Sequence, residues 1–192
     1  PIGQFIDETA KALEGLPISC GREIHLTDFM KENMQARDRS SRILSALSAA
    51  FGGIFTCNAN KTETTVGYGT LYGDLAGAFA ATDLWKYQIY HLGRLLNDWY
   101  ESPVIPEGIF TVKPSAELSE KQDVTKGMGD PLIYEYHDYL LKSFVEPWQR
   151  LCPEDLLTWY AEGSLEAHIG CHVRVQDLFP TAKAFTEDLE RW

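Results

Sequence analysis

The stretch N-A-N-K-T-E-T-T-V-G-Y-G-T-L-Y-G-D-L-A-G-A-F-A-A-T-D-L-W-K occupies residues 58–86. It follows a short apolar run at 53–57, which we predict to be a buried strand. Five glycines lie in or just before it: Gly53, Gly67, Gly69, Gly73 and Gly77. A packed core has no need of such a segment, whereas a loop that brings backbone and small polar groups close to a ligand does. The stretch therefore predicts a small-ligand site after a strand.

The composition indicates one folded domain with an acidic surface. The chain has 192 residues, of which 44% are hydrophobic and 12% aromatic, enough to bury a core. Its formal net charge is -11, from 17 Lys+Arg against 28 Asp+Glu, which argues against binding of nucleic acid or a membrane surface. An anionic small ligand remains compatible, because a few cations and helix N-termini can hold phosphate. No apolar run approaches the length of a membrane span, and no leader pattern opens the chain.

The four cysteines are Cys20, Cys57, Cys152 and Cys171, and no pair of them forms C-x-x-C. We interpret them as free thiols in a reducing compartment, which predicts a cytoplasmic protein. Cys171 lies between His168 and His172, and the three side chains could ligate a metal. Ordinary side chains at a helix end are the favoured interpretation, because no second ligand pair accompanies them.

Apolar spacing predicts helices over residues 4–14, 27–51, 83–100, 131–145, 153–162 and 180–192, with a strand over 53–57. Thr27 or Asp28 should cap the second helix, and Gly52 should help to end it. Asp83 should cap the third helix.

Residues 15–25 and 101–130 are rich in proline or glycine and should be mostly loop. The number of strands is low for a helix-rich α/β domain. We therefore expect further strands before Pro1, and we interpret both ends as lying inside a longer protein.

Two side chains of the segment E-N-M-Q-A-R-D-R are candidates for anion binding. Asn33 and Arg37 are four residues apart and share one helix face. A guanidinium beside an amide can hold a phosphate or a carboxylate. The alternative is a solvated face on which Glu32 and Asp38 pair with the arginines, and spacing alone favours this alternative.

Further candidates follow the predicted strand. Glu63 comes where α/β folds bind ligands, and its carboxylate could hold Mg²⁺ or a ribose hydroxyl, with Asn58 and Thr62 beside it. Alternatively, Thr62 and Glu63 begin the next helix. Lys86 stands in the first turn of a helix, where a cation is unfavourable against the helix dipole, which suggests contact with phosphate. Ser115 could contact ligand or cap a turn.

At these residues the chain resembles the NAD⁺ synthetase family, in particular the synthetase domain of the bacterial glutamine-dependent form. The matching segments are E-N-M-Q-A-R (32–37), F-G-G-I-F-T-C-N-A-N-K-T-E (51–63), V-G-Y-G-T-L-Y-G-D-L-A-G-A-F (66–79), D-L-W-K (83–86) and K-P-S-A-E-L (113–118). P-E-D-L-L-T-W-Y and the final F-P-T-A-K-A-F-T-E-D-L-E-R-W are similar to the family's C-terminal region. The resemblance implies an α/β fold, part of a Rossmann-like parallel sheet of the ATP-pyrophosphatase (adenine-nucleotide alpha hydrolase) type, here helix-rich because N-terminal strands are missing.

The resemblance also implies an activity, that of a carbon–nitrogen ligase. The family amidates nicotinic acid adenine dinucleotide to NAD⁺. ATP first adenylylates the pyridine carboxylate, and ammonia, supplied by glutamine in the parent, then attacks the acyl adenylate. This chemistry needs Mg²⁺ and cations to hold phosphate charge. Family members also dimerise, and the small face of helix 27–51 is the expected homodimer contact.

The resemblance assigns roles to individual residues. Asn33, Arg37, Glu63 and Asp74 are expected to bind the dinucleotide substrate, and Glu63 is also expected to bind the metal. The residues expected to bind ATP are Asn58, Lys86 and Ser115. No catalytic residue is implied.

The chain departs from the family pattern in what it contains. Asn58-Ala59 stand where the family often has Thr-Gly. The S-G-G-x-D-S pyrophosphate loop, the glutaminase domain and the final basic segment are not found. We therefore interpret residues 1–192 as the C-terminal part of a synthetase domain and expect the isolated chain to be inactive. The alternatives are a related ATP-pyrophosphatase ligase with another acid substrate, and a non-catalytic nucleotide-binding or dimerisation fragment.

Overall fold

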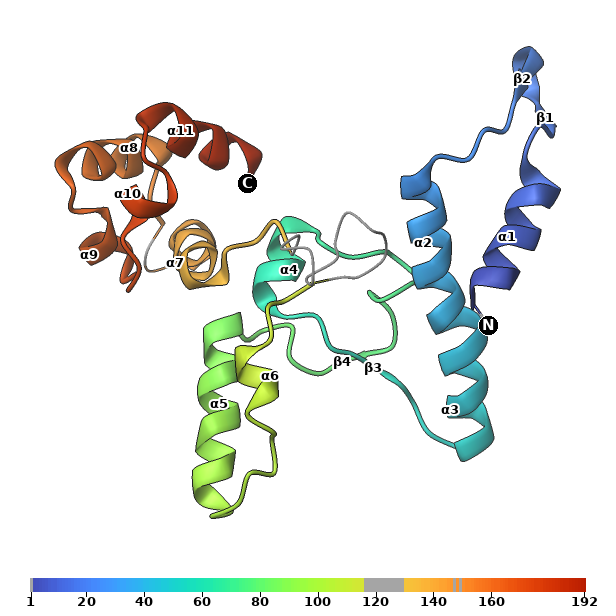
Figure 1. The fold of residues 1–192 in the computed structure, drawn as a ribbon, viewed down its shortest axis with the longest axis horizontal. Helices are drawn as coiled ribbons and strands as arrows, with labels where there is room; N and C mark the ends of the chain where they lie inside the picture. Colours follow the sequence, from blue (N-terminus) through green and yellow to red (C-terminus); the bar gives the residue numbers. More distant parts are fainter. Residues whose placement is uncertain (1, 116–129, 147, 149) are drawn as a thin grey trace. The chain divides into compact units, whose positions relative to one another are not determined.

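The computed structural model describes residues 2–115, 130–146, 148 and 150–192 (Figure 1). These residues form two compact units. Unit 1 holds the described residues of Pro1–Ala59, Tyr68–Thr82 and Lys113–Gly129. Unit 2 holds those of Asn60–Gly67, Asp83–Val112 and Asp130–Trp192. The glycine-rich stretch at 58–86 thus contributes to both units.

A long helical segment dominates unit 1 and runs through α2 (Asp28–Asp38), the π-helix η2 (Arg39–Leu44) and α3 (Ser45–Phe51). The Thr27 side chain accepts a hydrogen bond from Met30 N at 3.3 Å, and Gly52 ends the segment with φ 64°. The predicted start and end are therefore confirmed, whereas the π-helical distortion between them was not predicted.

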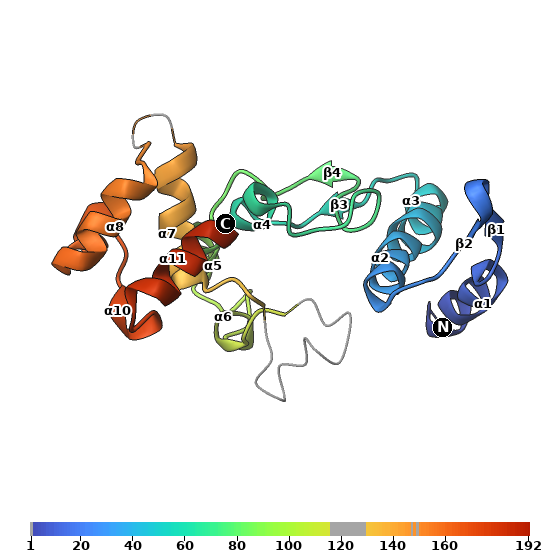
Figure 2. The same cartoon turned by 90° about the horizontal axis from the view of Figure 1, so that it is seen from above.

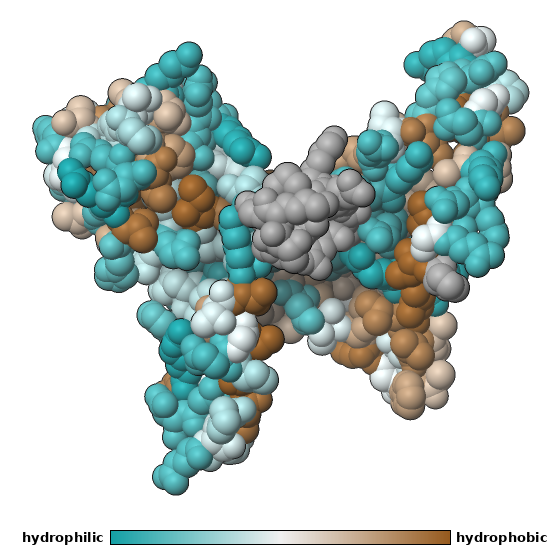
Figure 3. Space-filling view, in the orientation of Figure 1, coloured by the Kyte–Doolittle hydropathy of each residue, from teal (hydrophilic) through white to brown (hydrophobic). Residues whose placement is uncertain are grey.

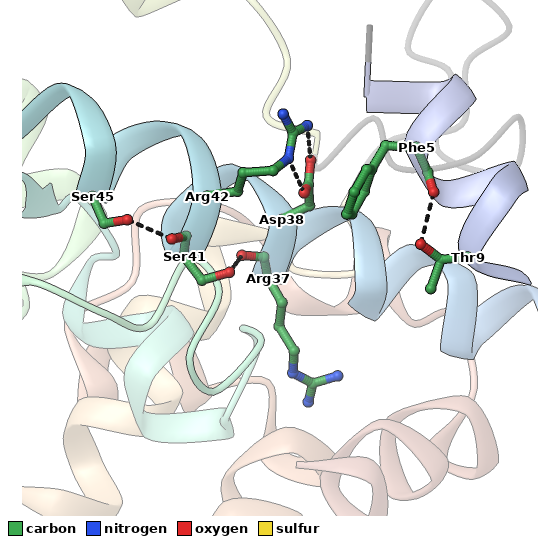
Figure 4. A network of polar contacts seen from close by, with 7 residues as sticks. All are labelled: Phe5, Thr9, Arg37, Asp38, Ser41, Arg42 and Ser45. Atoms are coloured by element: carbon green, nitrogen blue, oxygen red, sulfur yellow. Dashed lines mark hydrogen bonds and ion pairs between the residues drawn. The ribbon is translucent and has the colours of Figure 1, made fainter. Parts of the chain in front are cut away.

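The first helix, α1 (Ile2–Leu13), packs beside α2, as both cartoons show (Figures 1 and 2). The guanidinium of Arg42 lies 4.5 Å from the centre of the Phe5 ring and pairs with Asp38 on the same helical segment (Figure 4). The hydrogen bonds from Arg42 hold the pKa of Asp38 below its usual range. Asp38 therefore pairs with Arg42, which lies outside the segment E-N-M-Q-A-R-D-R that the solvated-face alternative considered.

Residues 15–25 were predicted to be loop, but the structure shows a small hairpin within them. β1 (Pro17–Ile18) pairs antiparallel with β2 (Arg22–Glu23) across the short 3-10 turn η1 (Ser19–Gly21). Backbone pairing at Pro17↔Glu23 and Ile18↔Arg22 sets the register. Positive φ at Cys20 and Gly21, 66° and 68°, closes the turn.

The predicted strand is shorter than expected. β3 (Thr56–Cys57) pairs in parallel with β4 (Ala78–Phe79), as Figure 2 shows. Ile54, expected to be buried, is 78% exposed. Gly77 has φ 82°, and a Cβ there would lie 2.5 Å from the carbonyl oxygen of Phe55, so this approach requires glycine. A parallel strand pair in a helix-rich chain is a partial α/β fold, which confirms the predicted class.

Unit 2 is helical. Its helices are α4 (Lys61–Val66), α5 (Lys86–Trp99), α6 (Gly108–Thr111), α7 (Tyr134–Val145), α8 (Pro153–Glu162), α9 (Leu165–Ile169), α10 (Val175–Leu178) and α11 (Ala182–Arg191). The fully buried Tyr136 and Leu140 of α7 and Phe185 of α11 belong to its core. The predicted helices α7, α8 and α11 are confirmed, and the short α9 and α10 were not predicted. Among the described helices, none has the length and apolar character needed to cross a bilayer.

The start of α5 corrects one prediction. Asp83 lies before the helix, which begins at Lys86, so Asp83 is not its cap. The backbone N–H of Trp85 donates instead to Gln88 Oε1 at 2.9 Å, and that of Tyr87 donates to Asp138 Oδ2 at 2.8 Å. A carboxylate from α7 therefore satisfies a first-turn donor that a local residue was expected to satisfy.

The helical segment 28–51 also presents large apolar side chains to solvent. Figure 3 shows hydrophobic residues gathered over α3, where Leu47 and Phe51 are 50% and 86% exposed. Part of the predicted small face is occupied within unit 1, because Ala36 and Ser40 are buried. The hydroxyl of Ser41 donates to the carbonyl of Arg37 one turn earlier (Figure 4).

Candidate functional site

Glu63 lies in the first turn of α4 and takes part in its cap. The side chain of Asn60 accepts from Glu63 N at 3.0 Å, and Glu63 Oε2 accepts from Asn60 N at 2.9 Å. This reciprocal arrangement is a capping box, which satisfies two backbone donors at the helix start. The interpretation that Glu63 begins a helix is therefore confirmed, and its other oxygen, Oε1, remains for contacts beyond the helix.

That second oxygen meets Tyr134. The Tyr134 hydroxyl lies 2.9 Å from Glu63 Oε1 and 2.9 Å from Asp130 Oδ2. Burial, followed by the charges of Glu63 and Asp130, raises the pKa of Tyr134, so the hydroxyl keeps its proton. Because a phenol has a single proton, it can donate fully to only one of the two carboxylates at a time.

The arrangement fits a hard divalent cation. Asp130 Oδ1 is buried and accepts no hydrogen bond from any residue that the structure describes. Carboxylate oxygens are the ligands that Mg²⁺ prefers, and a cation would balance the two negative charges that share one phenolic proton. Glu63 and Asp130 are therefore the residues of unit 2 that could hold Mg²⁺.

Lys86 reaches the same place from another helix. It lies in the first turn of α5, as predicted, but as the first residue of the helix, and its Nζ lies 5.4 Å from the ring centres of both Tyr90 and Tyr134. The structure thus brings two predicted site residues to Tyr134: Glu63 contacts its hydroxyl, and the Lys86 ammonium lies over its ring. Lys86 also lines a cavity of about 170 Å³ together with Tyr90, Tyr134 and Asp138.

A second cluster forms in unit 1 around segment 69–75. The Thr70 hydroxyl donates to Asn33 Oδ1 at 2.9 Å, and Thr70 N donates to Asp74 Oδ1 at 3.1 Å. Asn33 Nδ2 donates to the carbonyl of Phe29 at 2.9 Å. The predicted dinucleotide residues Asn33 and Asp74 therefore hold this segment in place, one on α2 and one within the segment itself.

Arg37 completes this cluster. Its Nε donates to the carbonyl of Leu71 at 3.2 Å, while Figure 4 shows the guanidinium extending away from the Asp38–Arg42 pair. A guanidinium carries five N–H donors in a planar fork. Arg37 is thus fixed through one nitrogen and can present the others to an anion.

The remaining predicted residues belong to unit 1. Asn58 is exposed and its Oδ1 accepts from the Thr56 hydroxyl at 2.9 Å. Ser115 is half-buried at the end of the described segment after α6. Contact of Asn58 and Ser115 with ATP stays a prediction.

Sequence reasoning missed three residues of unit 2, namely Asp130, Tyr134 and Asp138. They recur at every fourth position, Asp130 just before α7 and the other two within it, so that Tyr134 and Asp138 share one face of the helix. Asp138 is fully buried, and burial raises its pKa to about 6. The four-residue spacing of these polar groups was the signal that could have identified them.

The alternative metal group at 168–172 has no support in the structure. The His168 ring stacks on Trp159 with centres 3.9 Å apart, whereas the His172 ring packs edge-on against Tyr139 at 5.8 Å. The thiol of Cys171 is buried and donates to the carbonyl of Glu135. Over the ranges that the structure describes, no group of three or more His, Cys, Asp or Glu side chains is placed to hold a metal ion.

The parallel strand pair and its helices define the class of protein, a partial α/β domain. A solved structure supports this fold: the NMN synthetase from Francisella tularensis matches with a TM-score of 0.54 and 22% identity, over 88% of this chain and 57% of that one. The chain belongs to the NAD synthase family, whose sequence profile matches residues 5–159. The predicted resemblance is therefore confirmed.

Curated relatives agree with this family. The glutamine-dependent NAD(+) synthetase of Thermotoga maritima is 37% identical over 157 residues, which cover 81% of this chain and 25% of that protein. The enzyme of the same description from Aquifex aeolicus is 40% identical over 131 residues, 68% of this chain and 22% of that protein. The chain thus spans about a quarter of the length of the curated relatives that it matches.

Proposed function

We propose that this chain is part of a carbon–nitrogen ligase that uses ATP to amidate nicotinic acid adenine dinucleotide to NAD⁺. In this proposal, residues 1–192 are the C-terminal part of its synthetase domain, and ammonia comes from glutamine elsewhere in the parent protein. The names of the relatives, glutamine-dependent NAD(+) synthetases, support this assignment. We further propose a cytoplasmic location, on the basis of the acidic composition and free thiols.

The observation that carries the proposal is the meeting of Glu63 and Lys86 at Tyr134, from two different helices. Glu63 and Asp130 would hold Mg²⁺, which supplies charge neutralisation at phosphate oxygens. The ammonium of Lys86, kept beside the Tyr134 ring, would face the remaining phosphate charge of ATP. Anion-binding and cation-binding groups in one place suit a metal–nucleotide complex better than either ion alone.

The dinucleotide is assigned to the cluster in unit 1. Arg37 has N–H donors beyond the one used on Leu71, and these suit a phosphate or carboxylate of the dinucleotide. Asn33 and Asp74 hold segment 69–75 through Thr70 and have part of their polar capacity left for ligand. On this proposal, Arg37 supplies the positive charge that binds the anion, and Asn33 and Asp74 fix the conformation of segment 69–75 around the ligand.

Calorimetric titration of the chain with ATP and Mg²⁺ tests the nucleotide side. We expect Lys86→Met and Glu63→Gln to weaken binding at least about ten-fold, the effect of losing one charged contact. Lys183→Met is the matched control, because Lys183 is an exposed lysine of α11 that pairs with Glu187 at 3.7 Å. Equal affinity in Lys86→Met and Lys183→Met, or no saturable binding to the wild-type chain, would contradict the proposal.

The substrate is tested by thermal shift. Nicotinic acid adenine dinucleotide should raise the melting temperature of the chain, and other carboxylic acids joined to adenylate groups should not. Arg37→Met should remove that shift. A larger shift with another acid would favour the related ATP-pyrophosphatase ligase instead.

The family resemblance implies that catalysis uses an S-G-G-x-D-S pyrophosphate loop, and this motif does not occur in the sequence. We therefore expect no NAD⁺ from the isolated chain with ATP, Mg²⁺, ammonia and the dinucleotide. Measurable NAD⁺ would show that expectation to be wrong. If the coding sequence that flanks this chain lacks such a loop, the non-catalytic binding fragment becomes the better description.

We also propose a homodimer that forms through the helical segment 28–51. Its exposed apolar residues, including Leu47 and Phe51 of α3, supply contact area in addition to the small residues of the predicted face. Sedimentation should show a dimer at micromolar concentration. A wild-type chain that stays monomeric there would contradict the dimer without affecting the ligand assignments.

A further inference from the structure

Asp138 of α7 connects the two helices that carry Glu63 and Lys86. Its Oδ1 accepts a hydrogen bond from the Thr62 hydroxyl, and its Oδ2 accepts from Tyr87 N at 2.8 Å. Thr62 directly precedes Glu63 on α4, and Tyr87 directly follows Lys86 on α5. One carboxylate therefore joins the immediate neighbours of the two residues proposed to face Mg²⁺ and ATP.

The contacts of Asp138 are well suited to fix the distance between the first turns of α4 and α5. Asp138 and Thr62 are both completely buried, so water cannot replace either partner without cost. The Tyr87 contact is to main chain, and it satisfies a first-turn donor that has no partner within its own helix. The position of the α5 backbone, and with it that of Lys86, thus depends on Asp138.

A second carboxylate, that of Glu146, also connects α4 with the start of α5. Glu146, at the end of α7, accepts from Lys61 Nζ at 2.9 Å and from Trp85 Nε1 at 3.1 Å. It again connects the start of α4 with the start of α5, but through side chains only. The Lys61 side chain is 30% exposed, so this contact constrains the backbones less than the one at Asp138 does.

We infer that Asp138 is a positioning residue, which sets the place of Lys86 relative to Glu63 for binding of ATP with Mg²⁺. The functional part of this inference rests on the function proposed above. Asp138 itself would touch no ligand and would act through Thr62 and Tyr87. A role confined to core stability would leave the position of Lys86 unchanged once the chain is folded.

The test variant is Asp138→Asn, made in the 192-residue chain. The Thr62 hydroxyl and the Tyr87 amide donate to different oxygens of Asp138, and in asparagine an NH₂ group, which cannot accept, replaces one of them, so one of the two hydrogen bonds is lost in its present form. The control is Asp188→Asn, since Asp188 of α11 binds His137 Nε2 at 3.1 Å and His137 precedes Asp138 on α7. The control replaces a carboxylate that also contacts α7, but it leaves the hydrogen bonds of Asp138 to Thr62 and Tyr87 unchanged.

Nuclear magnetic resonance of the Lys86 side chain reports its position without any ligand. The rings of Tyr90 and Tyr134 should shift the resonances of the Lys86 ε-methylene, because its Nζ lies 5.4 Å from both ring centres. We expect Asp138→Asn to move these resonances towards those of an exposed lysine, with helix content unchanged. Asp188→Asn should leave them in place even if it lowers the melting temperature.

Binding gives the functional readout. Asp138→Asn should weaken binding of ATP with Mg²⁺ by about ten-fold, the lower range for losing an outer-shell partner of a metal site, and Asp188→Asn should not. Unchanged Lys86 resonances in Asp138→Asn, or an equal change in the control, would overturn the inference. If the wild-type chain binds no ATP, the proposed function fails, and the Lys86 resonances alone decide whether Asp138 positions Lys86.

If Asp138→Asn does not fold, Thr62 provides a milder pair of variants. Thr62→Val removes only the hydroxyl that Asp138 accepts from, at nearly constant shape, and should weaken binding of ATP with Mg²⁺. Thr62→Ser keeps the hydroxyl and should restore most of that binding. Equal binding by the valine and serine variants would overturn the inference.

Discussion

Gly73 lies so close to Ala36 that a Cβ at position 73 would stand 3.0 Å from the carbonyl carbon of Ala36. Ala36 is completely buried in α2, and one turn later the Ser40 hydroxyl donates to the carbonyl of Gly73. Segment 69–75 thus meets the helix by backbone-to-backbone contact, which a side chain would prevent.

Gly73→Ala should therefore displace this segment and lower the free energy of unfolding by about 1–3 kcal/mol, as overpacking against backbone does. Urea unfolding followed by circular dichroism measures the loss. Gly53→Ala is the matched control, because a Cβ at Gly53 meets no atom within 4 Å and its φ is not positive. Equal stability of the two variants would mean that the segment is not held as described.

Glu146→Gln tests the link between α4 and α5 that uses side chains. The hydrogen bond from Lys61, with a second from Trp85, holds the pKa of Glu146 below its usual range. Its stabilising effect is thus present above the unfolded-state pKa and is lost as the pH falls through the native-state pKa. At neutral pH the variant should be less stable by on the order of 1–2 kcal/mol, since Lys61 is partly solvated.

That stability difference should shrink as the pH falls below about 4.5, because the carboxyl of the unfolded wild type then takes up a proton before that of the native state does. Urea titrations at neutral and acid pH measure it. The control is Glu187→Gln, whose carboxylate lies 3.7 Å from the exposed Lys183 and should contribute almost nothing. A loss in Glu146→Gln that does not change with pH would contradict the charge argument.

Asp138 should give the opposite pH dependence. Burial raises its pKa from 3.8 to about 6, so the native state holds a proton that the unfolded chain has already released. The free energy of unfolding of the wild type should therefore fall as the pH rises from about 4 to about 6. Asp138→Asn lacks this proton, and the stability difference between wild type and variant should change by up to about 3 kcal/mol across the window.

Chemical denaturation at a series of pH values, with wild type and Asp138→Asn side by side, measures this change. Other carboxylates titrate equally in both proteins, so only the difference is interpreted. Parallel stability curves would show that Asp138 titrates normally in the folded chain.

Tyr134→Phe tests the proposed cation site. Without the hydroxyl, Glu63 and Asp130 lose their shared donor, so the variant should be less stable without divalent cation, by about 1–3 kcal/mol. Mg²⁺ should then raise the melting temperature of the variant more than that of the wild type, because it alone balances the two carboxylates. Melting curves with Mg²⁺ and with chelator measure the effect.

Tyr160→Phe serves as the control, since its hydroxyl donates to the carbonyl of Phe179 at 2.6 Å, a neutral acceptor. It should lose stability without changing its response to Mg²⁺. An identical Mg²⁺ response in both variants would argue against a cation held by Glu63 and Asp130.

Much of the helical structure could be predicted because its signals are local. Thr27 begins α2, Gly52 ends α3 and Pro153 opens α8, and each acts on the few backbone groups nearest to it. The family was likewise identifiable from short motifs in order, a property of the sequence alone. The short length of β3 and the π-helical η2 could not be predicted, because they depend on what packs against them.

By itself, the sequence determined the positions of the main helices, the family, and the residues worth testing. Only the tertiary structure decided how those residues are grouped and held. It showed that the first turn of α5 is capped at Tyr87 by Asp138, which lies 51 positions later in the chain, and not by Asp83. It also showed that Tyr134 joins Glu63 across 71 positions. Such contacts depend on how α7 packs against α4 and α5, and no local spacing rule carries that information.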